Sequence, residues 1–394
     1  MIKVGVIYGG ESVEHEVSII TAVTLMENLD TEKYEAIPIY ISKEREWYTG
    51  DVLKKIENYQ DLDNLKRYAK KMIFYRDKNK FIIRKKDFPR YCLNEVDIII
   101  PAVHGANVED GSIQGYLEIL GVPYVGSNVY GSVLGQDKVF MKQIFKDYML
   151  PITKYIWFFD TEYNHDSKKI IKEVEHIGYP VIVKPATLGS SVGISKAKNE
   201  EELLIAIDEA LQYDYKIVVE ECIEDMVDIN CSVLGDYQYQ QTSEIQEIKP
   251  KGDYFTYEEK YISGNKKGKM KNKKGVKGSS NIYIMAPNIS NDIKKEIREI
   301  SKKAFIALNL SGLARMDFIV NKKENKVYIN EPNTIPGDFS YFMWEAVGKE
   351  YKNLLDDLIT LAIKQHRKKG KRIFSFETNL LQNPWISTKG KEKR

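Results

Sequence analysis

Apolar residues follow two different periods in the first third of the chain. Short apolar runs bounded by turn residues predict buried strands, which we expect at 3–10, 34–42, 96–105 and 122–127. Segments with a 3.6-residue apolar period lie between them and predict helices at 14–29 and 111–121. Strands that alternate with helices favour a mostly parallel sheet, with a functional edge at the carboxyl ends of its strands.

The pattern becomes mixed after residue 127. Helices are expected at 128–148, 199–213 and 291–310. Strands are expected at 179–186, 216–223, 228–236, 312–320 and 325–333. The predicted fold class is therefore α/β followed by α+β. We place the divisions so that the chain consists of 1–126, 127–223, 224–365 and a basic extension at 366–394.

Composition narrows the class of protein. The 394 residues suffice for two or three domains, and the formal net charge of +2 gives no indication of nucleic-acid binding. The run 265–278 carries seven lysines and no acid, which is typical of a solvated segment. Sparse cysteines without a CxxC pattern, no signal peptide and no apolar run long enough to span a bilayer predict a soluble, cytoplasmic protein.

A lysine-bearing strand leads directly into a glycine- and serine-rich loop, KPATLGSSVGIS at 184–195. Such a loop can place the Lys184 ammonium, hydroxyl groups and backbone N–H groups around phosphates. The GxxxxGK[ST] spacing of a P-loop is absent. Taken alone, the loop fits a phosphate site and a solvated hairpin turn equally well.

Two adjacent carboxylates, Glu220 and Glu221, end the strand expected at 216–223, and Asp228 follows after a short stretch. The backbone of such a strand can pair with the edge of an adenine ring, and a nearby acid can accept hydrogen bonds from ribose hydroxyls. An edge strand with solubilising charges explains the same residues, and on this segment alone it is the better explanation.

The last two strands predict a hairpin that gathers polar side chains. Residues two apart on a strand share a face, so Arg315 lies with Asp317, and Glu331 lies with Asn333. If the two faces coincide, two carboxylates, an amide oxygen and a guanidinium meet. Oxygen ligands suit Mg²⁺, and an adjacent arginine can stabilise an anionic transition state. Because a buried acid cluster without a cation is costly, we favour a metal site over a surface row of charges.

In this order, the lysines, the loop, the Glu-rich strand and the acidic hairpin resemble an ATP-grasp enzyme, and in particular the D-alanine–D-alanine ligase family. The stretches that carry the resemblance are GGESVEHEVS (9–18), HGANVEDGSIQGYLEILGVPYVGS (104–127), GQDKVFMK (135–142), YPVIVKPATLGSSVGISK (179–196), YFTYEEKY (254–261), GLARMDF (312–318) and NEPNTIPG (330–337). The resemblance implies an ATP-grasp fold in two subdomains, preceded by a Rossmann-like, parallel-sheet domain that binds substrate. It also implies a lid loop at 250–285.

The family's chemistry follows from the poor reactivity of a carboxylate. Family members join two D-amino acids at the expense of ATP, for peptidoglycan precursors. The first carboxylate attacks the γ-phosphate and becomes an acyl phosphate, whose carbonyl is then attacked by the amine of the second substrate. Catalysis is mainly positioning and charge stabilisation. The resemblance implies ATP, two Mg²⁺ (or Mn²⁺) and a homodimer.

The resemblance also implies roles for individual residues. The implied catalytic residues are Glu14, Ser190, Tyr261, Arg315 and Gly337. Those implied in ATP binding are Lys138, Lys184, Ser191, Glu220, Glu221, Ile223, Asp228 and Lys260. Those implied in substrate binding are Val17, Ser18, His104, Glu109, Tyr257 and Ser340, and the implied metal ligands are Asp317, Glu331 and Asn333. In this scheme Ser190 ties the lid residue Tyr261 to Glu14, which holds the first ammonium.

Three features depart from the family pattern. The Lys-rich run extends the lid, and Pro332 stands where an aliphatic residue is usual, which predicts an edge strand there. After Gly337, Phe339 replaces a Thr and Phe342 replaces the Ser that binds the acceptor carboxylate. Ser340 is two residues out of register with that Ser.

Three functions therefore stay open at this point. The first is a D-alanine–D-alanine ligase. The second is a ligase of the same chemistry with D-Ser, D-lactate or another amine as acceptor, and the third is a nucleotide-binding relative without turnover. The complete set of lysines, arginine and acids argues against the last of these.

Overall fold

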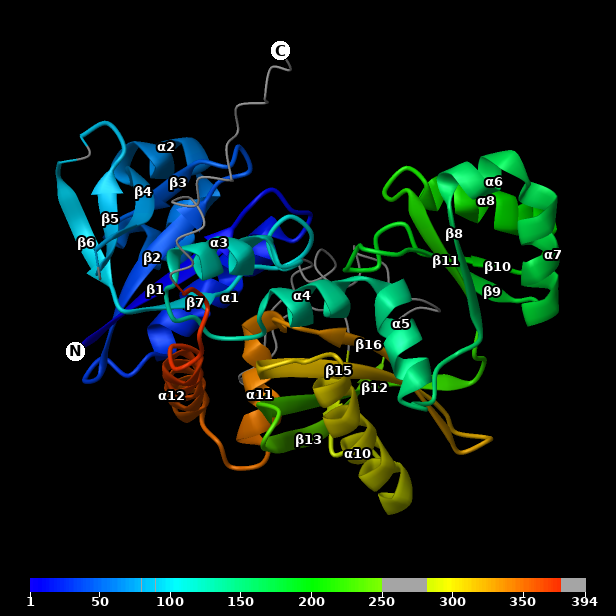
Figure 1. Ribbon diagram of the computed structural model, residues 1–394. Helices are drawn as coiled ribbons and strands as arrows, with labels where there is room; N and C mark the ends of the chain where they lie inside the picture. The colour runs from blue at the N-terminus through cyan, green and yellow to red at the C-terminus, as the bar shows by residue number, and fades with distance from the viewer. Residues whose placement is uncertain (79, 89, 250–281, 377–394) are drawn as a thin grey trace, which may run out of the picture.

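The computed structural model describes residues 1–78, 80–88, 90–249 and 282–376. Within these residues the chain forms three sheets, of seven, four and five strands, and helices pack against them (Figure 1). Of the segment expected to form a lid, the described part includes only β14 (Ile282–Met285) and the residues just after it. Among the described residues, no helix is both long and apolar enough to cross a membrane.

The N-terminal sheet is mixed. Its strands lie in the order β6-β5-β4-β3-β2-β1-β7, with bounds β1 Ile2–Gly9, β2 Tyr34–Ile41, β3 Trp47–Thr49, β4 Lys70–Asp77, β5 Lys80–Lys85, β6 Cys92–Val96 and β7 Ile98–Pro101. Parallel pairing is confined to β2, β1 and β7, and the remaining pairs are antiparallel. The expectation of a mostly parallel sheet was therefore wrong for β3 to β6, because charged residues between 66 and 95 obscure their strand pattern.

Helices and short turns complete this first domain. They are α1 (His15–Asn28), α2 (Leu62–Tyr68), α3 (Ser112–Leu120) and the 3₁₀ turns η1 (Asp51–Lys54) and η2 (Ile56–Gln60). Gly121 ends α3 in the left-handed conformation, which glycine adopts without strain. The strand expected at 122–127 is reduced to a single bridge between Tyr124 and Ile99.

The central sheet is antiparallel throughout and carries its helices on the outside (Figure 1). Its order is β10-β9-β11-β8, with bounds β8 Tyr155–Phe159, β9 Val181–Pro185, β10 Ser195–Ala197 and β11 Lys216–Glu221. The helices are α6 (Asp160–His165), α7 (Ser167–Ile177) and α8 (Glu200–Ala210). The Asn199 side chain caps α8 by accepting from the N–H of Glu202.

The C-terminal sheet has the order β14-β13-β12-β15-β16. Its remaining strands are β12 (Met226–Gly235), β13 (Gln240–Lys249), β15 (Gly312–Asn321) and β16 (Lys326–Asn333), and the helix α10 (Asn291–Ala307) packs against it. Strand β16 lies at the edge, as Pro332 predicts, because an edge strand does not need a donor on its outer side.

The helix expected at 128–148 is two helices, α4 (Val129–Gln136) and α5 (Lys138–Asp147). Asp137 breaks the continuity, because its carboxylate accepts from the N–H groups of Val139 and Phe140 and caps α5. The other carboxylate oxygen receives Lys216 at 2.6 Å. This break places Lys138 at the first position of a new helix.

The hydrophobic cores do not follow the divisions drawn on the sequence. Met141 and Phe145 of α5 belong to the core under the C-terminal sheet, although they precede the central sheet in the chain. The chain after β16 returns to the N-terminal domain through η3 (Gly337–Ser340), α11 (Tyr341–Glu345) and α12 (Tyr351–Lys369), which share its core. Helix α12 continues past residue 365, where the extension was expected to begin.

Candidate active site

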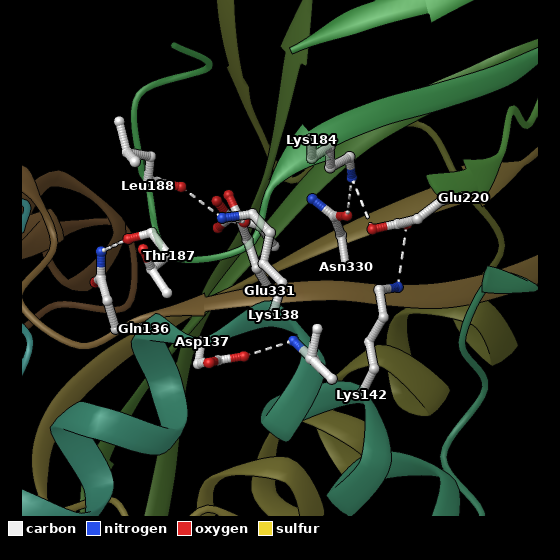
Figure 2. Close-up of polar contacts among 12 residues, drawn as sticks. Gln136, Asp137, Lys138, Lys142, Lys184, Thr187, Leu188, Glu220, Asn330 and Glu331 are labelled. Atoms are coloured by element: carbon white, nitrogen blue, oxygen red, sulfur yellow. Dashed lines mark hydrogen bonds and ion pairs between the residues drawn. The ribbon is translucent and has the colours of Figure 1, made fainter. Parts of the chain in front are cut away.

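The polar hairpin has the geometry that its sequence predicts. Arg315 on β15 lies opposite Asn333 on β16, and Asp317 lies opposite Glu331. The four side chains therefore project from the same face of the sheet. The face that they share is the one toward Lys138 and the central sheet (Figure 2).

Arg315 and Asp317 form a bidentate ion pair. Arginine Nε lies 2.7 Å from Oδ1 and Nη2 lies 2.7 Å from Oδ2, and each side chain is 21% exposed. Glu331 also has a cation nearby, with Lys138 Nζ at 3.5 Å from its Oε2. The cost of an uncompensated acid cluster therefore does not arise here, and that argument for a metal does not hold.

The choice of donor atoms is the observation that still fits a metal. Asn333 Oδ1 is buried and accepts no hydrogen bond in the structure. With two carboxylates beside it, the site offers the oxygen ligands that Mg²⁺ prefers. In the described part of the chain, no three His, Cys, Asp or Glu side chains gather closely enough to hold a metal ion by themselves. An amide and substrate oxygens must complete the coordination.

Two lysines from different elements reach this hairpin (Figure 2). Lys138 at the start of α5 donates to the Leu188 carbonyl at 2.6 Å and faces Glu331, and only 7% of its side chain is exposed. Lys184 at the end of β9 donates to Asn330 Oδ1 at 3.3 Å and is 10% exposed. Lys138 is paired with Glu331, and Lys184 lies 3.2 Å from Glu220, so each lysine has a carboxylate partner at this corner of the site.

The glycine- and serine-rich loop is held over the same corner. The Gln136 amide donates to the Thr187 carbonyl at 2.8 Å, and Lys138 binds the next carbonyl in the chain. Ser190 and Ser191 both adopt a positive φ, which turns the loop sharply. This fixes the loop to α4 and α5 and places it against the beginning of α1.

Glu220 ends the buried part of β11 and is only 2% exposed. Its carboxylate lies between Lys142 at 3.1 Å and Lys184 at 3.2 Å. Burial alone would raise the pKa of Glu220, but these two lysines outweigh it and lower the pKa to about 2. Sequence reasoning missed Lys142, although its four-residue spacing from Lys138 puts it one helical turn along the same face.

The other residues expected at the adenosine end lie beyond Glu220. Glu221 Oε1 accepts from the N–H of Lys154 at 2.7 Å, and Ile223 is half-exposed in the link between β11 and β12. Asp228 is half-exposed near the start of β12. All three lie where the chain passes from the central to the C-terminal sheet, so the structure brings them to one boundary.

The beginning of α1 contributes the other side of the site. The Ser190 hydroxyl donates to Glu14, and a Cβ on Gly105 would come within 2.7 Å of the same carboxylate. Ser18 is buried, and its hydroxyl accepts from the N–H of Gly9 at 2.8 Å. Ser18 therefore shapes the turn after β1, while Val17 beside it is half-exposed.

Two buried titratable groups connect this turn to the hairpin. Glu109 accepts from the Thr334 hydroxyl at 3.0 Å, from the Ile335 N–H at 2.9 Å and from the Gly105 N–H at 3.0 Å. Burial, followed by the nearby Glu14 charge, raises the pKa of Glu109 to about 7. His104 lies 2.9 Å from the Thr21 hydroxyl, and burial lowers its pKa to about 4.

The chain after Pro336 forms a left-handed turn. Asp338, Phe339 and Ser340 all have φ near 50°, a conformation that non-glycine residues rarely adopt in succession. A Cβ at Gly337 would meet no atom within 4 Å, so space is open beside its Cα. Ser340 is fully buried and its hydroxyl has no hydrogen-bond partner, while Phe342 is half-buried with its ring 6.4 Å from that of Tyr283.

Three expected site residues, Tyr257, Lys260 and Tyr261, lie outside the described residues. The described members of the set come from all three sheets and from the turn after β16. Contacts of Ser190 with Glu14 and of Lys184 with Asn330 link the central sheet to the other two parts of the fold at these residues.

Comparison with known proteins agrees with this arrangement. Residues 3–127 match the family described as D-ala D-ala ligase N-terminus, and residues 144–360 match D-ala D-ala ligase C-terminus. The D-alanine--D-alanine ligase of Thermosipho melanesiensis is 38% identical over 382 residues, which are 97% of this chain and 99% of that protein.

Solved structures give the same result for the fold. The D-alanine-D-alanine ligase from Coxiella burnetii superposes with a TM-score of 0.76 at 30% identity, over 94% of this chain and 98% of that one. The VanG D-Ala:D-Ser ligase from Enterococcus faecalis has a TM-score of 0.74 at 29% identity, over 92% and 99%. The neighbours have the ATP-grasp fold, and this confirms the fold class expected from the sequence. The chain belongs to the D-alanine–D-alanine ligase family.

Proposed function

We propose that this chain is an ATP-dependent ligase that joins two D-alanine molecules through an acyl phosphate, for peptidoglycan precursor synthesis. One observation carries the proposal. Lys138, Lys184 and the Arg315–Asp317–Glu331–Asn333 hairpin converge from three separate elements on one corner of the site. This set of groups suits a triphosphate and its metal, and close relatives over nearly the full chain are named for this activity.

In the proposed reaction, the first D-alanine binds with its ammonium at Glu14. Its carboxylate oxygen attacks the γ-phosphorus of ATP, the bond to the β-phosphate oxygen breaks, and ADP leaves. Lys138 and Lys184 neutralise phosphate charge as it redistributes. The loop that carries Ser190 closes over Glu14, so the carboxylate and the phosphate are held together and water is excluded.

In the second step, the amine of the acceptor D-alanine attacks the acyl carbonyl carbon. The tetrahedral oxyanion would be stabilised by Arg315 and by the N–H of Gly337, a residue with open space beside its Cα. The bond from the carbonyl carbon to the phosphate oxygen then breaks, phosphate leaves and the amine loses a proton. Arg315 is already oriented by Asp317 for this role.

Asp317, Glu331 and Asn333 would hold two Mg²⁺ (or Mn²⁺), with Glu331 exchanging Lys138 for the metal while Asp317 keeps its pairing with Arg315. The ions would supply charge neutralisation between the phosphate groups. Lys138, released from Glu331, would then be available to the triphosphate. The adenosine part of ATP would lie along Glu220, Glu221, Ile223 and Asp228, where Glu220 Oε1 is a buried acceptor without a hydrogen bond.

D-Ser is an alternative acceptor, since one of the structural neighbours is titled a D-Ala:D-Ser ligase. Phe342 occupies the position expected for an acceptor-binding Ser, and Ser340 is turned into the protein interior. We propose that backbone N–H groups of the 337–342 turn bind the acceptor carboxylate in their place. We further propose a cytoplasmic homodimer, as is usual for the family.

Phosphate release decides among these functions. The purified protein is supplied with ATP and Mg²⁺, and with D-alanine alone or together with D-Ser or D-lactate. We expect release with D-alanine alone and a D-Ala-D-Ala product by mass spectrometry. Release only in the presence of D-alanine with another acceptor assigns that acceptor instead. ATP binding with no release under any pair identifies a relative without turnover.

A further inference from the structure

Lys142 is among the most deeply buried charged groups of the described structure. It lies on α5, its side chain is 1% exposed, and it is one of the largest fully buried side chains. Its ammonium lies 3.1 Å from Glu220 Oε2 (Figure 2) and donates to the Thr153 hydroxyl at 3.0 Å. A lysine is almost never buried to this extent unless a partner compensates its charge, and Glu220 is the carboxylate that compensates Lys142.

The two oxygens of Glu220 have different surroundings. Oε2 is bound on the inner side by Lys142 and by the Thr153 hydroxyl, which donates at 2.8 Å. Oε1 faces Lys184 at 3.2 Å but receives no hydrogen bond of good geometry. The inner contacts are therefore the tighter ones, and Lys184 shares its ammonium with Asn330 on β16.

The charges of this group do not cancel. Two lysines face one carboxylate, so the trio of Lys142, Glu220 and Lys184 carries one net positive charge in a poorly solvated place. With Lys142 absent, Glu220 and Lys184 would form a neutral pair, and Lys184 would have a buried carboxylate as its sole strong partner. With Lys142 present, Glu220 is already compensated from behind.

We propose that Lys142 is a positioning residue that compensates Glu220 from the interior and so leaves Lys184 available to an anionic ligand. It touches no substrate in this scheme and acts only through Glu220. The inference rests on the proposed function, in which Lys184 binds the phosphates of ATP. The net positive charge favours a polyphosphate and disfavours a neutral ligand, because binding the anion relieves the unbalanced charge.

Burial lowers the pKa of Lys142, and the Glu220 charge opposes this effect. The buried ammonium therefore depends on its close partners. Besides Glu220 and the Thr153 hydroxyl, the Tyr155 ring centroid lies 5.5 Å from the Lys142 ammonium and adds a contact that does not depend on hydrogen bonding.

A double-mutant cycle tests the inference on the full-length protein. The affinity for a non-hydrolysable ATP analogue with Mg²⁺ is measured by calorimetry for wild type, Lys142→Met, Glu220→Gln and the double variant, together with KM for D-alanine. We expect Lys142→Met to weaken analogue binding by about tenfold or more, with KM for D-alanine changed less than about twofold. In the Glu220→Gln background, Lys142→Met should weaken analogue binding less than about threefold, because the charge that Lys142 compensates is gone.

Two controls keep the outcome decisive. Arg298→Met breaks a partly buried ion pair with Glu244, 2.9 Å long and far from the predicted site residues in the fold, and should leave analogue binding unchanged. If Lys142→Met does not fold, Thr153→Val replaces it, since it removes a donor from the same Glu220 oxygen, and about threefold weaker analogue binding is expected.

If Lys142→Met weakens analogue binding equally in the wild-type and Glu220→Gln backgrounds, Lys142 acts by packing alone and the inference is overturned. The inference is also overturned if Lys142→Met and Thr153→Val both bind the analogue as tightly as wild type does. A wild-type protein that does not bind the analogue overturns the proposed function itself. The two failures are therefore distinguishable.

Discussion

Ser190 and Glu14 lie 176 positions apart in the sequence, and the Ser190 hydroxyl donates a hydrogen bond to the Glu14 carboxylate. The serine belongs to the loop between β9 and β10, and the glutamate directly precedes the first residue of α1. One contact therefore joins the central sheet to the N-terminal domain across the proposed substrate.

Replacing this serine should weaken binding of the first D-alanine. Ser190→Ala removes the donor that orients Glu14, so kcat/KM for D-alanine should fall about 10- to 100-fold while the melting temperature stays within a few degrees. Steady-state kinetics and a thermal melt measure the two effects. Ser195→Ala is the matched control, because Ser195 lies at the end of the same loop and binds only the exposed Glu209. Equal losses in the two variants would contradict a role of Ser190 in the site.

The metal assignment is tested at Glu331. Glu331→Gln keeps the shape but removes the charge, so turnover should fall at least about 100-fold, and raised Mg²⁺ should recover part of it. Phosphate release over a Mg²⁺ titration is the measurement. Glu324→Gln, in the turn of the same hairpin, removes a carboxylate that pairs only with exposed Lys326 and should behave as wild type. Unchanged activity of Glu331→Gln would remove Glu331 from the metal site.

Arg315 should not be replaceable by lysine. Its two contacts with Asp317 need a planar guanidinium, and a lysine can make only one of them. We expect Arg315→Lys to lower kcat about 100-fold or more with little change in KM for ATP, because the lost interaction belongs to the transition state. A variant with normal kcat and raised KM would instead place Arg315 in ground-state binding.

His104 should make the protein less stable in acid. Its folded pKa is about 4, lowered by burial, whereas an unfolded histidine titrates near about 6.5. The neutral ring is favoured in the fold, so its contribution is complete above about pH 6.5 and is lost as the pH falls toward about 4. The difference corresponds to about 3 kcal/mol of unfolding free energy.

Urea unfolding of wild type and His104→Asn at pH 7.5 and at pH 4.5 measures this effect. The wild type should lose more stability between the two values than the variant does. His165→Asn, at the exposed end of α6, should retain the wild-type dependence. Parallel pH profiles for wild type and His104→Asn would show that His104 is protonated in the folded protein.

The basic extension should be dispensable only beyond α12. Truncation after residue 365 would remove the last turn of that helix, including the Lys369 ammonium that binds Glu118 of α3. A chain that ends at residue 376 keeps this contact. We expect it to release phosphate at the wild-type rate, whereas a chain that ends at 365 should melt at a lower temperature. If the chain that ends at residue 376 keeps its fold but loses activity, the residues beyond 376 are needed for catalysis.

Sequence reasoning located the elements whose pattern is local. The hairpin of β15 and β16 and the edge position of Pro332 were predicted correctly, because alternation and a missing N–H act within a few residues. The continuous helix at 128–148 was wrong, because Asp137 can cap a helix as well as sit inside one, and its partner Lys216 is remote in the chain.

The residues of the site also divide into those that could be named from the sequence and those that could not. Motif residues such as Lys138, Lys184 and Glu331 could be named from the sequence, since the chemistry of phosphate and metal demands particular functional groups at particular strand ends. Lys142 could not be recognised, because a lysine in an amphipathic helix usually points to solvent. Its burial depends on β11 bringing Glu220 to the same place.

The sequence by itself determined the family and the reaction class, because the groups that carry the chemistry occur in a family-specific order. Only the tertiary structure decided which charges share a partner and which segments share a core. Residues 335–362 complete the core of the N-terminal domain, and Lys142 and Lys184 divide one carboxylate between them. These pairings are set by the packing of segments remote in the chain, where burial makes each unpaired charge costly and leaves one arrangement favourable.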